Sequence, residues 1–202
     1  MNECCLPILR LTFATVLMGM STLPIAMAYA DEPPCAGTDL SVAQASMVDA
    51  KKAIDASIAA IDNPSQSDLS NLATWLGVHS SSDSAIVRDK LVATRTYTDG
   101  AVFLCANSTD IGLGDIYAYV RPDNSFVIVL GIFFTQAPPT GFNSKLGTLV
   151  HEMSHFVLAG ATKDIVYGID GAKNLAATNP SAARQNADNY EYFVEATVFG
   201  LK

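Results

Sequence analysis

The sequence predicts a mainly helical α+β domain with a small antiparallel sheet. Residues 39–99 carry apolar side chains at helical spacing, whereas residues 101–134 contain short runs of β-branched and aromatic residues. Helical spacing returns after residue 144. A run of strands between two runs of helices is typical of α+β folds, in which the helices pack on one face or end of the sheet.

We expect three helices before Gly100. The single tryptophan, Trp75, lies in the second of them and is expected in the core. A run of serines and an aspartate from Ser80 separates the second helix from the third, which surrounds Ile86 and Leu91. The candidate N-caps and stop signals are Asp39 or Ser41 and Asn63-Pro64 for the first helix, and Ser67 or Asp68 and Gly77 for the second.

Three strands are expected next. The first is Ala101 to Cys105, the second Ile116 to Val120 and the third Ser125 to Phe134. Arg121-Pro122-Asp123-Asn124 has the composition of a turn, so the second and third strands are expected to form a hairpin. A further helix should follow Asn179 or Ser181 and run to about Phe199.

The first thirty residues have the pattern of a secretory signal peptide. Arg10 precedes an apolar stretch from Leu11 to Met20, and Ala28-Tyr29-Ala30 offers small residues for cleavage after Ala28 or Ala30. The apolar stretch is too short to cross a bilayer as a stable helix, and no other stretch is long enough. We expect a single domain over residues 31–202, exported to the cell exterior or a periplasm, without a membrane span.

The net charge indicates which partners the protein can bind, and the cysteine content indicates whether it contains a disulfide. The net charge of −8 disfavours binding to nucleic acid and favours cationic partners. Cys4 and Cys5 leave with the signal peptide, which leaves Cys35 and Cys105 in the mature chain. Two cysteines in an exported chain usually pair, so we expect one disulfide between them.

The segment His151-Glu152-Met153-Ser154-His155 indicates a metal site on a helix. Ser144 is a plausible cap of this helix and Gly160 its expected end. Residues four apart lie on one helical face about 6 Å from each other, near enough for His151 and His155 to share a zinc ion. Glu152 can then act as a base toward a metal-activated water. The competing interpretation is a pair of surface histidines beside a solvated glutamate.

A catalytic zinc needs a third protein ligand and an open fourth position. The residues after the motif offer several carboxylates, and their chemistry alone does not choose among them. The candidates are Asp164, Asp170, Asp188, Glu191 and Glu195.

The segment Thr162-Lys163-Asp164-Ile165-Val166-Tyr167-Gly168 resembles the signature of the aspzincin metallopeptidases, the deuterolysin family. In that family the motif helix precedes a GTxDxxYG segment whose aspartate is the third zinc ligand. The resemblance implies a zincin-like fold, one zinc ion per chain, Asp164 as a ligand and Tyr167 as the hydroxyl that stabilises the developing oxyanion. Ala161 stands where the family has its first glycine, and we expect a slightly altered turn there.

The segment Asn186-Ala187-Asp188-Asn189-Tyr190-Glu191-Tyr192-Phe193 is similar to the peptidyl-Lys metalloendopeptidase branch of that family. The resemblance implies that Asp188 and Glu191 line the pocket for the residue after the cut. Protein or peptide substrates would then be cleaved on the amino side of lysine. Composition alone favours a different interpretation, a solvated acidic face that continues to Glu195.

Three classes of function remain from the sequence. The first is a secreted zinc endopeptidase with Glu152 as base. The second is a non-catalytic binding protein that retains the metal on a protease fold, and the intact Glu152 argues against it. The third is a helical interaction domain in which the motif is accidental.

Overall fold

The computed structural model describes residues 32–106, 116–123 and 126–202. The predicted signal peptide, residues 1–30, lies outside these described residues. Asp31–Lys202 packs as one compact unit. None of the helices in the described ranges is long and apolar enough to cross a membrane.

Three helices precede the sheet: α1 (Gly37–Asp62), α2 (Gln66–Leu76) and α3 (Ser81–Tyr97). The expected cap of α1 is wrong, because the helix begins at Gly37 and the Ser41 hydroxyl donates to the Gly37 carbonyl within the first turn. The expected cap of α2 is also wrong. Ser65 caps this helix by accepting a hydrogen bond from the Asp68 amide, and the Asp68 carboxylate accepts one from the Ser65 amide. Asp68 is therefore the second partner of a capping box.

A three-stranded sheet follows, formed by β1 (Val102–Cys105), β2 (Ala118–Tyr119) and β3 (Val127–Leu130). The pairing of β2 with β3 is antiparallel, which confirms the expected hairpin. The pairing of β1 with β3 is parallel, so the sheet is mixed and the expectation of an antiparallel sheet is wrong for β1. In the strand order β1-β3-β2, β1 and β3 are not consecutive in sequence, so no hairpin joins them and they can pair in parallel.

The helix that carries the histidine motif is α4 (Lys145–His155). The Ser144 hydroxyl accepts a hydrogen bond from the Gly147 amide at 3.2 Å, which confirms the expected cap. The helix ends at His155 and not at Gly160, because Phe156 leaves the helical region with a ψ of 131°. The chain therefore turns directly after the second histidine.

The C-terminal region contains α5 (Ile169–Thr178), α6 (Pro180–Ala183) and α7 (Ala187–Phe199). The sequence patterns did not predict α5, and the single final helix expected from residue 179 is divided into α6 and α7. Asn186 separates the two with an extended backbone, φ −97° and ψ 129°, and its side chain hydrogen-bonds the loop that precedes α5. A tertiary contact therefore interrupts a segment whose sequence is compatible with one helix.

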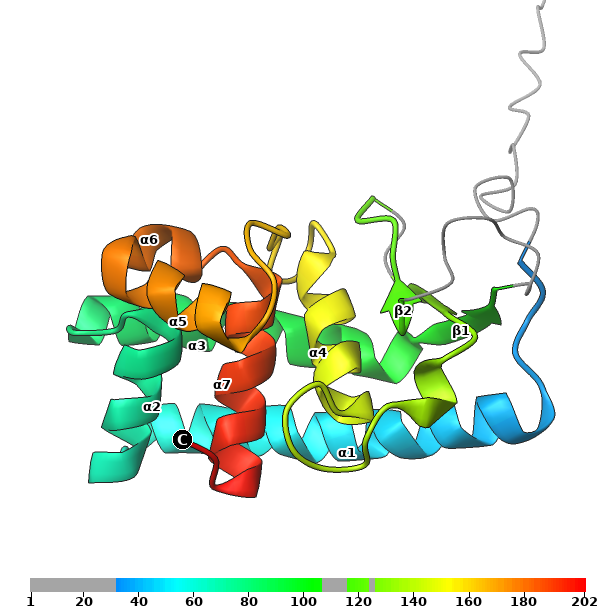
Figure 1. The fold of residues 1–202 in the computed structure, drawn as a ribbon, viewed down its shortest axis with the longest axis horizontal. Helices are drawn as coiled ribbons and strands as arrows, with labels where there is room; N and C mark the ends of the chain where they lie inside the picture. Colours follow the sequence, from blue (N-terminus) through cyan, green and yellow to red (C-terminus); the bar gives the residue numbers. More distant parts are fainter. Residues whose placement is uncertain (1–31, 107–115, 124–125) are drawn as a thin grey trace, which may run out of the picture. The chain divides into compact units, whose positions relative to one another are not determined.

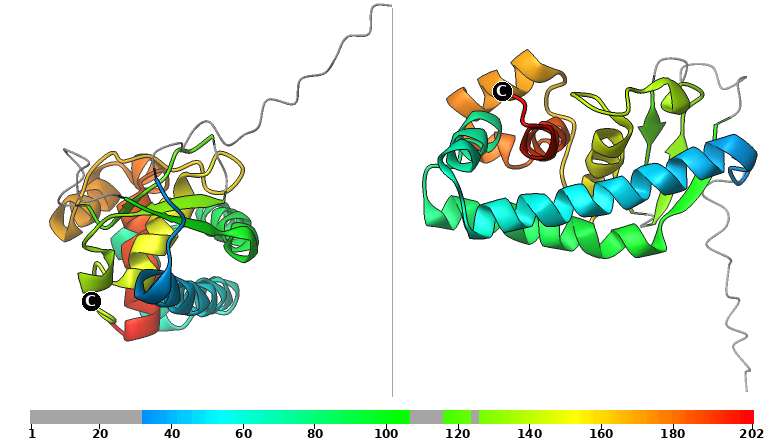
Figure 2. Two further views of the ribbon diagram at one scale, coloured as in Figure 1. Left: turned by 90° about the vertical axis from the view of Figure 1, so that its right-hand side faces the viewer. Right: turned by 90° about the horizontal axis from the view of Figure 1, so that it is seen from below.

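The helices α4 and α7 pack against each other, and both pack on the long helix α1 (Figures 1 and 2). The helix α2 packs on α7, and α5 contacts both. Trp75 is fully buried, which confirms its expected place in the core, and its ring lies 5.2 Å from that of Phe142. In α4 every residue from Leu146 to His155 is buried. The histidine motif is thus embedded in the fold, which excludes the interpretation of two surface histidines.

Cys35 and Cys105 form the expected disulfide, with their Cα atoms 4.9 Å apart. The lead before α1 also pairs with β1 through backbone hydrogen bonds, from the Cys35 amide to the Phe103 carbonyl and from the Cys105 amide to the Pro33 carbonyl. The disulfide and these bonds together fasten the start of α1 to the edge of the sheet.

Candidate metal centre and active site

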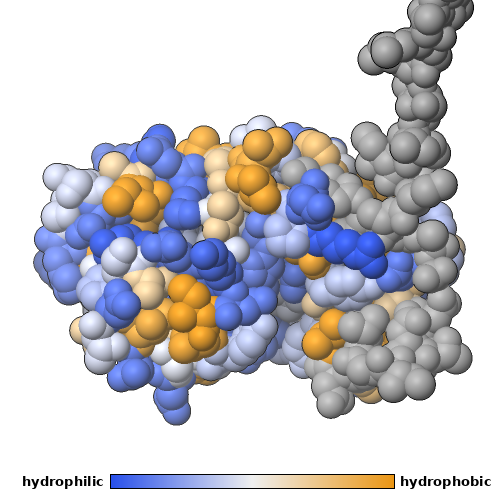
Figure 3. All heavy atoms as spheres, turned by 90° about the horizontal axis from the view of Figure 1, so that it is seen from above, coloured by the Kyte–Doolittle hydropathy of each residue, from blue (hydrophilic) through white to orange (hydrophobic). Residues whose placement is uncertain are grey.

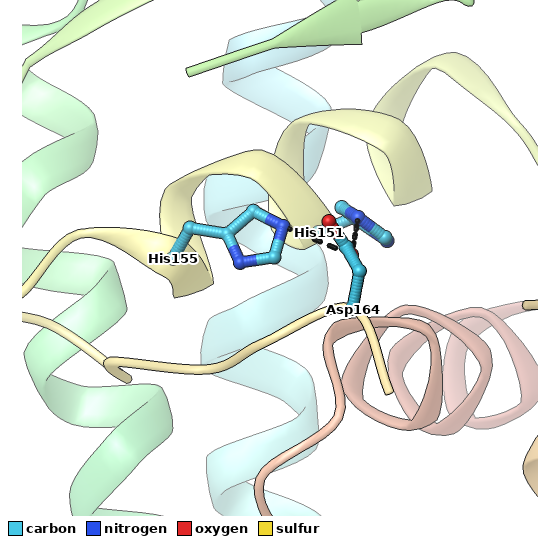
Figure 4. Close-up of side chains that lie close together, drawn as sticks. All are labelled: His151, His155 and Asp164. Carbon is cyan, nitrogen blue, oxygen red and sulfur yellow. Dashed lines mark ion pairs between the residues drawn. The ribbon is translucent and has the colours of Figure 1, made fainter. Parts of the chain in front are cut away.

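The histidines of α4 meet a carboxylate from the loop that follows the helix. The Oδ1 atom of Asp164 lies 3.1 Å from His151 Nε2 and 3.3 Å from His155 Nε2 (Figure 4). The three ligand atoms lie within 4.8 Å of one another. Two imidazole nitrogens and one carboxylate oxygen are a donor set that suits a catalytic zinc, and they leave a fourth coordination position open.

The short distances between these side chains shift their pKa values. Hydrogen bonds from His151 and His155 hold the pKa of Asp164 well below its usual value. Burial lowers the pKa of His151, but hydrogen bonds to Asp164, Asp188 and Glu191 outweigh burial and leave that pKa well above its ordinary value. A bound metal ion would supply positive charge that these carboxylates can balance.

The second ring nitrogen of each histidine also has a partner. His151 Nδ1 lies 2.9 Å from Asp188 Oδ1 and 3.2 Å from Glu191 Oε2. His155 Nδ1 lies 3.1 Å from the carbonyl oxygen of Thr162. Such partners fix the ring orientation and the tautomer that leaves Nε2 free to bind a metal. Both Nε2 atoms accordingly face Asp164.

The structure separates the candidates for the third ligand. Besides Asp164, Asp188 and Glu191 form a group with His151 that could hold a metal ion, but this group uses the Nδ1 atom and a single histidine. Glu195 is fully buried and accepts hydrogen bonds from the Ser144 amide and hydroxyl, both at 2.7 Å, at the start of α4. Of these carboxylates, Asp164 contacts both histidines of the motif.

Glu152 and Tyr167 lie beside the cluster in different surroundings. Glu152 is buried, and burial raises its pKa to about 7, although the neighbouring histidines oppose the shift. A bound cation would lower that pKa again. Tyr167 is 68% exposed, and its partial burial, followed by the charge of Asp164, raises its pKa. Glu152 thus faces the interior of the site, and Tyr167 stands at its rim.

A cleft of about 740 Å³ joins these residues. One side is formed by β2 and the hairpin turn, and the other by α4, the loop after it and the start of α7. Asp188 and Glu191 line the cleft although each is only 5% exposed, which is incompatible with a solvated acidic face. Figure 3 shows the face toward which the C-terminal end of α4 points. On this face, hydrophobic residues form separate patches among hydrophilic residues.

Three residues support the site through contacts that the sequence did not predict. Asn186 hydrogen-bonds the loop beyond Asp164, and Thr162 contacts the ring of His155 through its carbonyl. Glu195 approaches Gly147 so closely that a Cβ atom there would lie 2.0 Å from its carboxylate oxygen. The glycine inside a helix was a visible signal of such a close approach. Thr162 and Asn186 stand in the two segments that resemble the family, but neither segment indicates the hydrogen bonds that these residues make.

The family model described as lysine-specific metallo-endopeptidase, the aspzincin family, matches residues 61–195. The chain belongs to the aspzincin family. This aspzincin is 37% identical over 133 residues to a peptidyl-Lys metalloendopeptidase of Pleurotus ostreatus, a match that covers 66% of this chain and 77% of the relative. Membership of this family implies a zinc ion as cofactor and accounts for the mainly helical fold with a small sheet.

Other relatives share shorter regions with the aspzincin. A peptidyl-Lys metalloendopeptidase of Armillaria mellea is 52% identical over 81 residues, and an extracellular protease of Aeromonas hydrophila is 49% identical over 81 residues. Each match covers 40% of this chain and 23% of the relative, so the chain spans about a quarter of their length. The solved structure of a zinc peptidase from Grifola frondosa superposes with a TM-score of 0.71 at 32% identity, and covers 80% of this chain and 97% of that one.

Proposed function

We propose that this aspzincin is a secreted, zinc-dependent endopeptidase that binds one zinc ion through His151, His155 and Asp164. The observation that carries the proposal is the buried Glu152 next to three converging ligand atoms in an open cleft. A protein that only bound the metal would have no use for a desolvated base in that position. The relatives named as metalloendopeptidases and the zinc peptidase fold give independent support.

In this mechanism the protein side chains move the protons and hold the charges. Zinc, when bound, supplies Lewis acidity and brings the pKa of a water molecule near 7. Glu152 accepts the proton of the attacking water and delivers it to the leaving amine. Tyr167, at the rim of the cleft, donates a hydrogen bond to the oxyanion of the tetrahedral intermediate. Asp188 and Thr162 hold the rings of His151 and His155 in the orientation that metal binding requires.

We further propose that the enzyme cleaves on the amino side of lysine. Asp188 and Glu191 place two carboxylates in the cleft beside the three proposed zinc ligands. A lysine ammonium would neutralise negative charge that an apolar residue leaves unpaired. The relatives from Pleurotus ostreatus and Armillaria mellea are named peptidyl-Lys metalloendopeptidases, which supports the same specificity.

The two acids differ in how much of their hydrogen-bonding capacity the protein already uses. Asp188 Oδ1 contacts His151, and its Oδ2 accepts from the Gly168 amide at 2.7 Å and lies 3.3 Å from the Tyr192 hydroxyl. Within the described residues, Glu191 is engaged through Oε2. Glu191 also lines the cleft. We therefore assign most of the lysine recognition to Glu191.

The proposed secretion is supported by the signal-peptide pattern of residues 1–30 and by the disulfide, which suits an oxidising compartment. The relative from Aeromonas hydrophila is named an extracellular protease. Edman sequencing of protein recovered from the culture medium would show whether the chain begins after Ala28 or Ala30. An uncleaved N-terminus in cell extracts would contradict export.

One set of measurements tests the enzyme proposal. Purified protein should contain one zinc per chain by elemental analysis, and casein hydrolysis should stop with a chelator and return with zinc. Glu152→Gln is the matched variant, because it keeps the size of the side chain and removes the base. It should keep the zinc and lose at least about 100-fold in kcat, the lower end of what a general base contributes. Zinc binding without hydrolysis in the wild type would instead indicate the non-catalytic binding protein.

Specificity requires a separate assay. A peptide library prepared from a whole proteome would be digested with the purified enzyme and analysed by mass spectrometry. New N-termini should begin mostly with lysine. A flat or hydrophobic preference at that position would contradict the lysine pocket without affecting the assignment of the metal ligands.

A further inference from the structure

We propose that Asn186 is a positioning residue that holds Asp164 in place for metal binding. The inference rests on the proposed function, since it takes Asp164 as the third zinc ligand. The Asp164 side chain is 39% exposed, whereas those of His151 and His155 are 11% and 8% exposed. Packing fixes the histidines, which stand on a buried helix. The position of Asp164 depends on the backbone of its loop.

The backbone before Asp164 is paired with the segment between α6 and α7. The Lys163 amide donates to the Gln185 carbonyl at 2.8 Å, and the Ala187 amide donates to the Lys163 carbonyl at 3.0 Å. Lys163 and Asn186 thereby form an isolated parallel bridge. The residue before the ligand is thus held on both its amide and its carbonyl.

The backbone after Asp164 is held by the side chain of Asn186. Its Oδ1 accepts hydrogen bonds from the Ile165 amide at 2.8 Å and the Val166 amide at 3.1 Å. Its Nδ2 donates to the Val166 carbonyl at 3.1 Å and to Asn189 Oδ1 at 2.8 Å. A carboxamide can make four hydrogen bonds of this kind, and Asn186 makes all four while fully buried.

Asn189 connects this arrangement to the helical framework. It is fully buried, and its Nδ2 donates to the Trp75 carbonyl at the end of α2 and, at 2.9 Å, to the Ala172 carbonyl in α5. The loop is therefore bound to elements that contain no metal ligand. This places Asp164 opposite the histidines before a metal arrives, so that binding does not have to order the loop.

Loss of Asn186 would leave the Ile165 and Val166 amides without their partner in a partly buried loop. Aspartate would keep the acceptor but lose both donated bonds, and it would bring a carboxylate oxygen toward Asn189 Oδ1. In both variants Asp164 should no longer be fixed opposite His151. We expect zinc affinity to fall about 10- to 100-fold, as for other partners that orient metal ligands.

The experiment measures the zinc dissociation constant of the purified protein by competition with a chromogenic chelator. The variants are Asn186→Ala and Asn186→Asp, each with and without Asp164→Ala. Val87→Ala is the control, because Val87 is a fully buried residue of α3 and its truncation lowers stability without touching the loop. Asn186→Ala should weaken zinc binding in the wild-type background and add little to Asp164→Ala. Val87→Ala should leave the zinc dissociation constant unchanged.

Four outcomes would overturn the inference. Wild-type affinity in Asn186→Ala would refute it while the metal site stands. So would an equal loss in the Asp164→Ala background, because the residue would then act on the whole fold and not through Asp164. If the variants fail to fold, hydrogen exchange in the zinc-free wild type decides, since rapid exchange of the Ile165 and Val166 amides would exclude a preformed loop. A wild type that binds no zinc would refute the proposed function and, with it, this inference.

Discussion

His151 Nδ1 lies 2.9 Å from Asp188 Oδ1, while His151 Nε2 faces Asp164. An acid proposed to contact the substrate is therefore also the partner of a histidine proposed to bind the metal. In the proposed function this arrangement would couple substrate recognition to the metal site, and Glu191, whose Oε2 lies 3.2 Å from the same nitrogen, would contribute to it. The two buried acids should still respond differently to mutation, because Asp188 lies closer to His151 and also accepts a hydrogen bond from the Gly168 amide.

Asp188→Asn should weaken zinc binding by about 10-fold or more. The variant loses the negative charge beside His151, and its single amide oxygen can accept from either His151 or the Gly168 amide but not from both. Glu191→Gln should retain more of the zinc affinity and lose about 1–3 kcal/mol of the preference for lysine. Chelator competition and the peptide-library digest distinguish the two effects. Identical losses in both assays for both variants would show that the acids act as one unit.

Removal of the disulfide should lower stability without moving the active site. Cys35 and Cys105 are 70 residues apart in sequence, and closing a loop of this length is worth roughly 4 kcal/mol in the chain-entropy description. The double variant Cys35→Ala, Cys105→Ala should unfold at a lower urea concentration. Alkylation of the unreduced wild type, followed by intact mass measurement, should show no modified cysteine. Two modified cysteines in the mature protein would contradict the pairing.

Ala161→Gly should stabilise the protein by about 0.5–1 kcal/mol. Ala161 has a φ of 48°, in the left-handed region that disfavours a residue with a Cβ atom, and the aspzincin signature has glycine there. Gly160→Ala is the matched opposite, since a Cβ atom at Gly160 would lie 2.7 Å from the Ser154 carbonyl oxygen and should destabilise the turn. Urea unfolding of the two variants measures both effects. A loss of stability in Ala161→Gly would show that the turn is not strained.

Glu195 should make stability fall as the pH rises. Burial, and then the charge of Glu191, raise the pKa of Glu195 to about 8 in the folded protein, against roughly 4.3 in an unfolded chain. The folded state therefore binds this proton more tightly, so its contribution is complete below about pH 4.3 and is lost as the pH rises through about 8. The free energy of unfolding of metal-free protein should drop less between pH 6 and pH 9 in Glu195→Gln than in the wild type. Equal drops would assign the pH dependence to other groups.

The sequence by itself determined the local features of this protein. The spacing of His151 and His155 places both on one face of a helix, because helical periodicity is a property of the backbone alone. The turn after β2 specified the hairpin, and the two cysteines of the mature chain specified their own pairing. By resemblance, the signature around Asp164 predicts that this residue is the third ligand, whereas residue chemistry leaves five carboxylates open.

The tertiary structure decided what surrounds those features. A carboxylate on α7 becomes a buried partner of His151 because α4 covers that face, and the sequence of α7 alone cannot specify its neighbour. The same holds for β1, whose direction relative to β3 depends on the route of the chain between them. The break before α7 arises because Asn186 hydrogen-bonds a loop twenty residues earlier. Contacts between segments that are distant in sequence form, and stabilise the protein, only when the chain folds. A local sequence pattern therefore does not predict them.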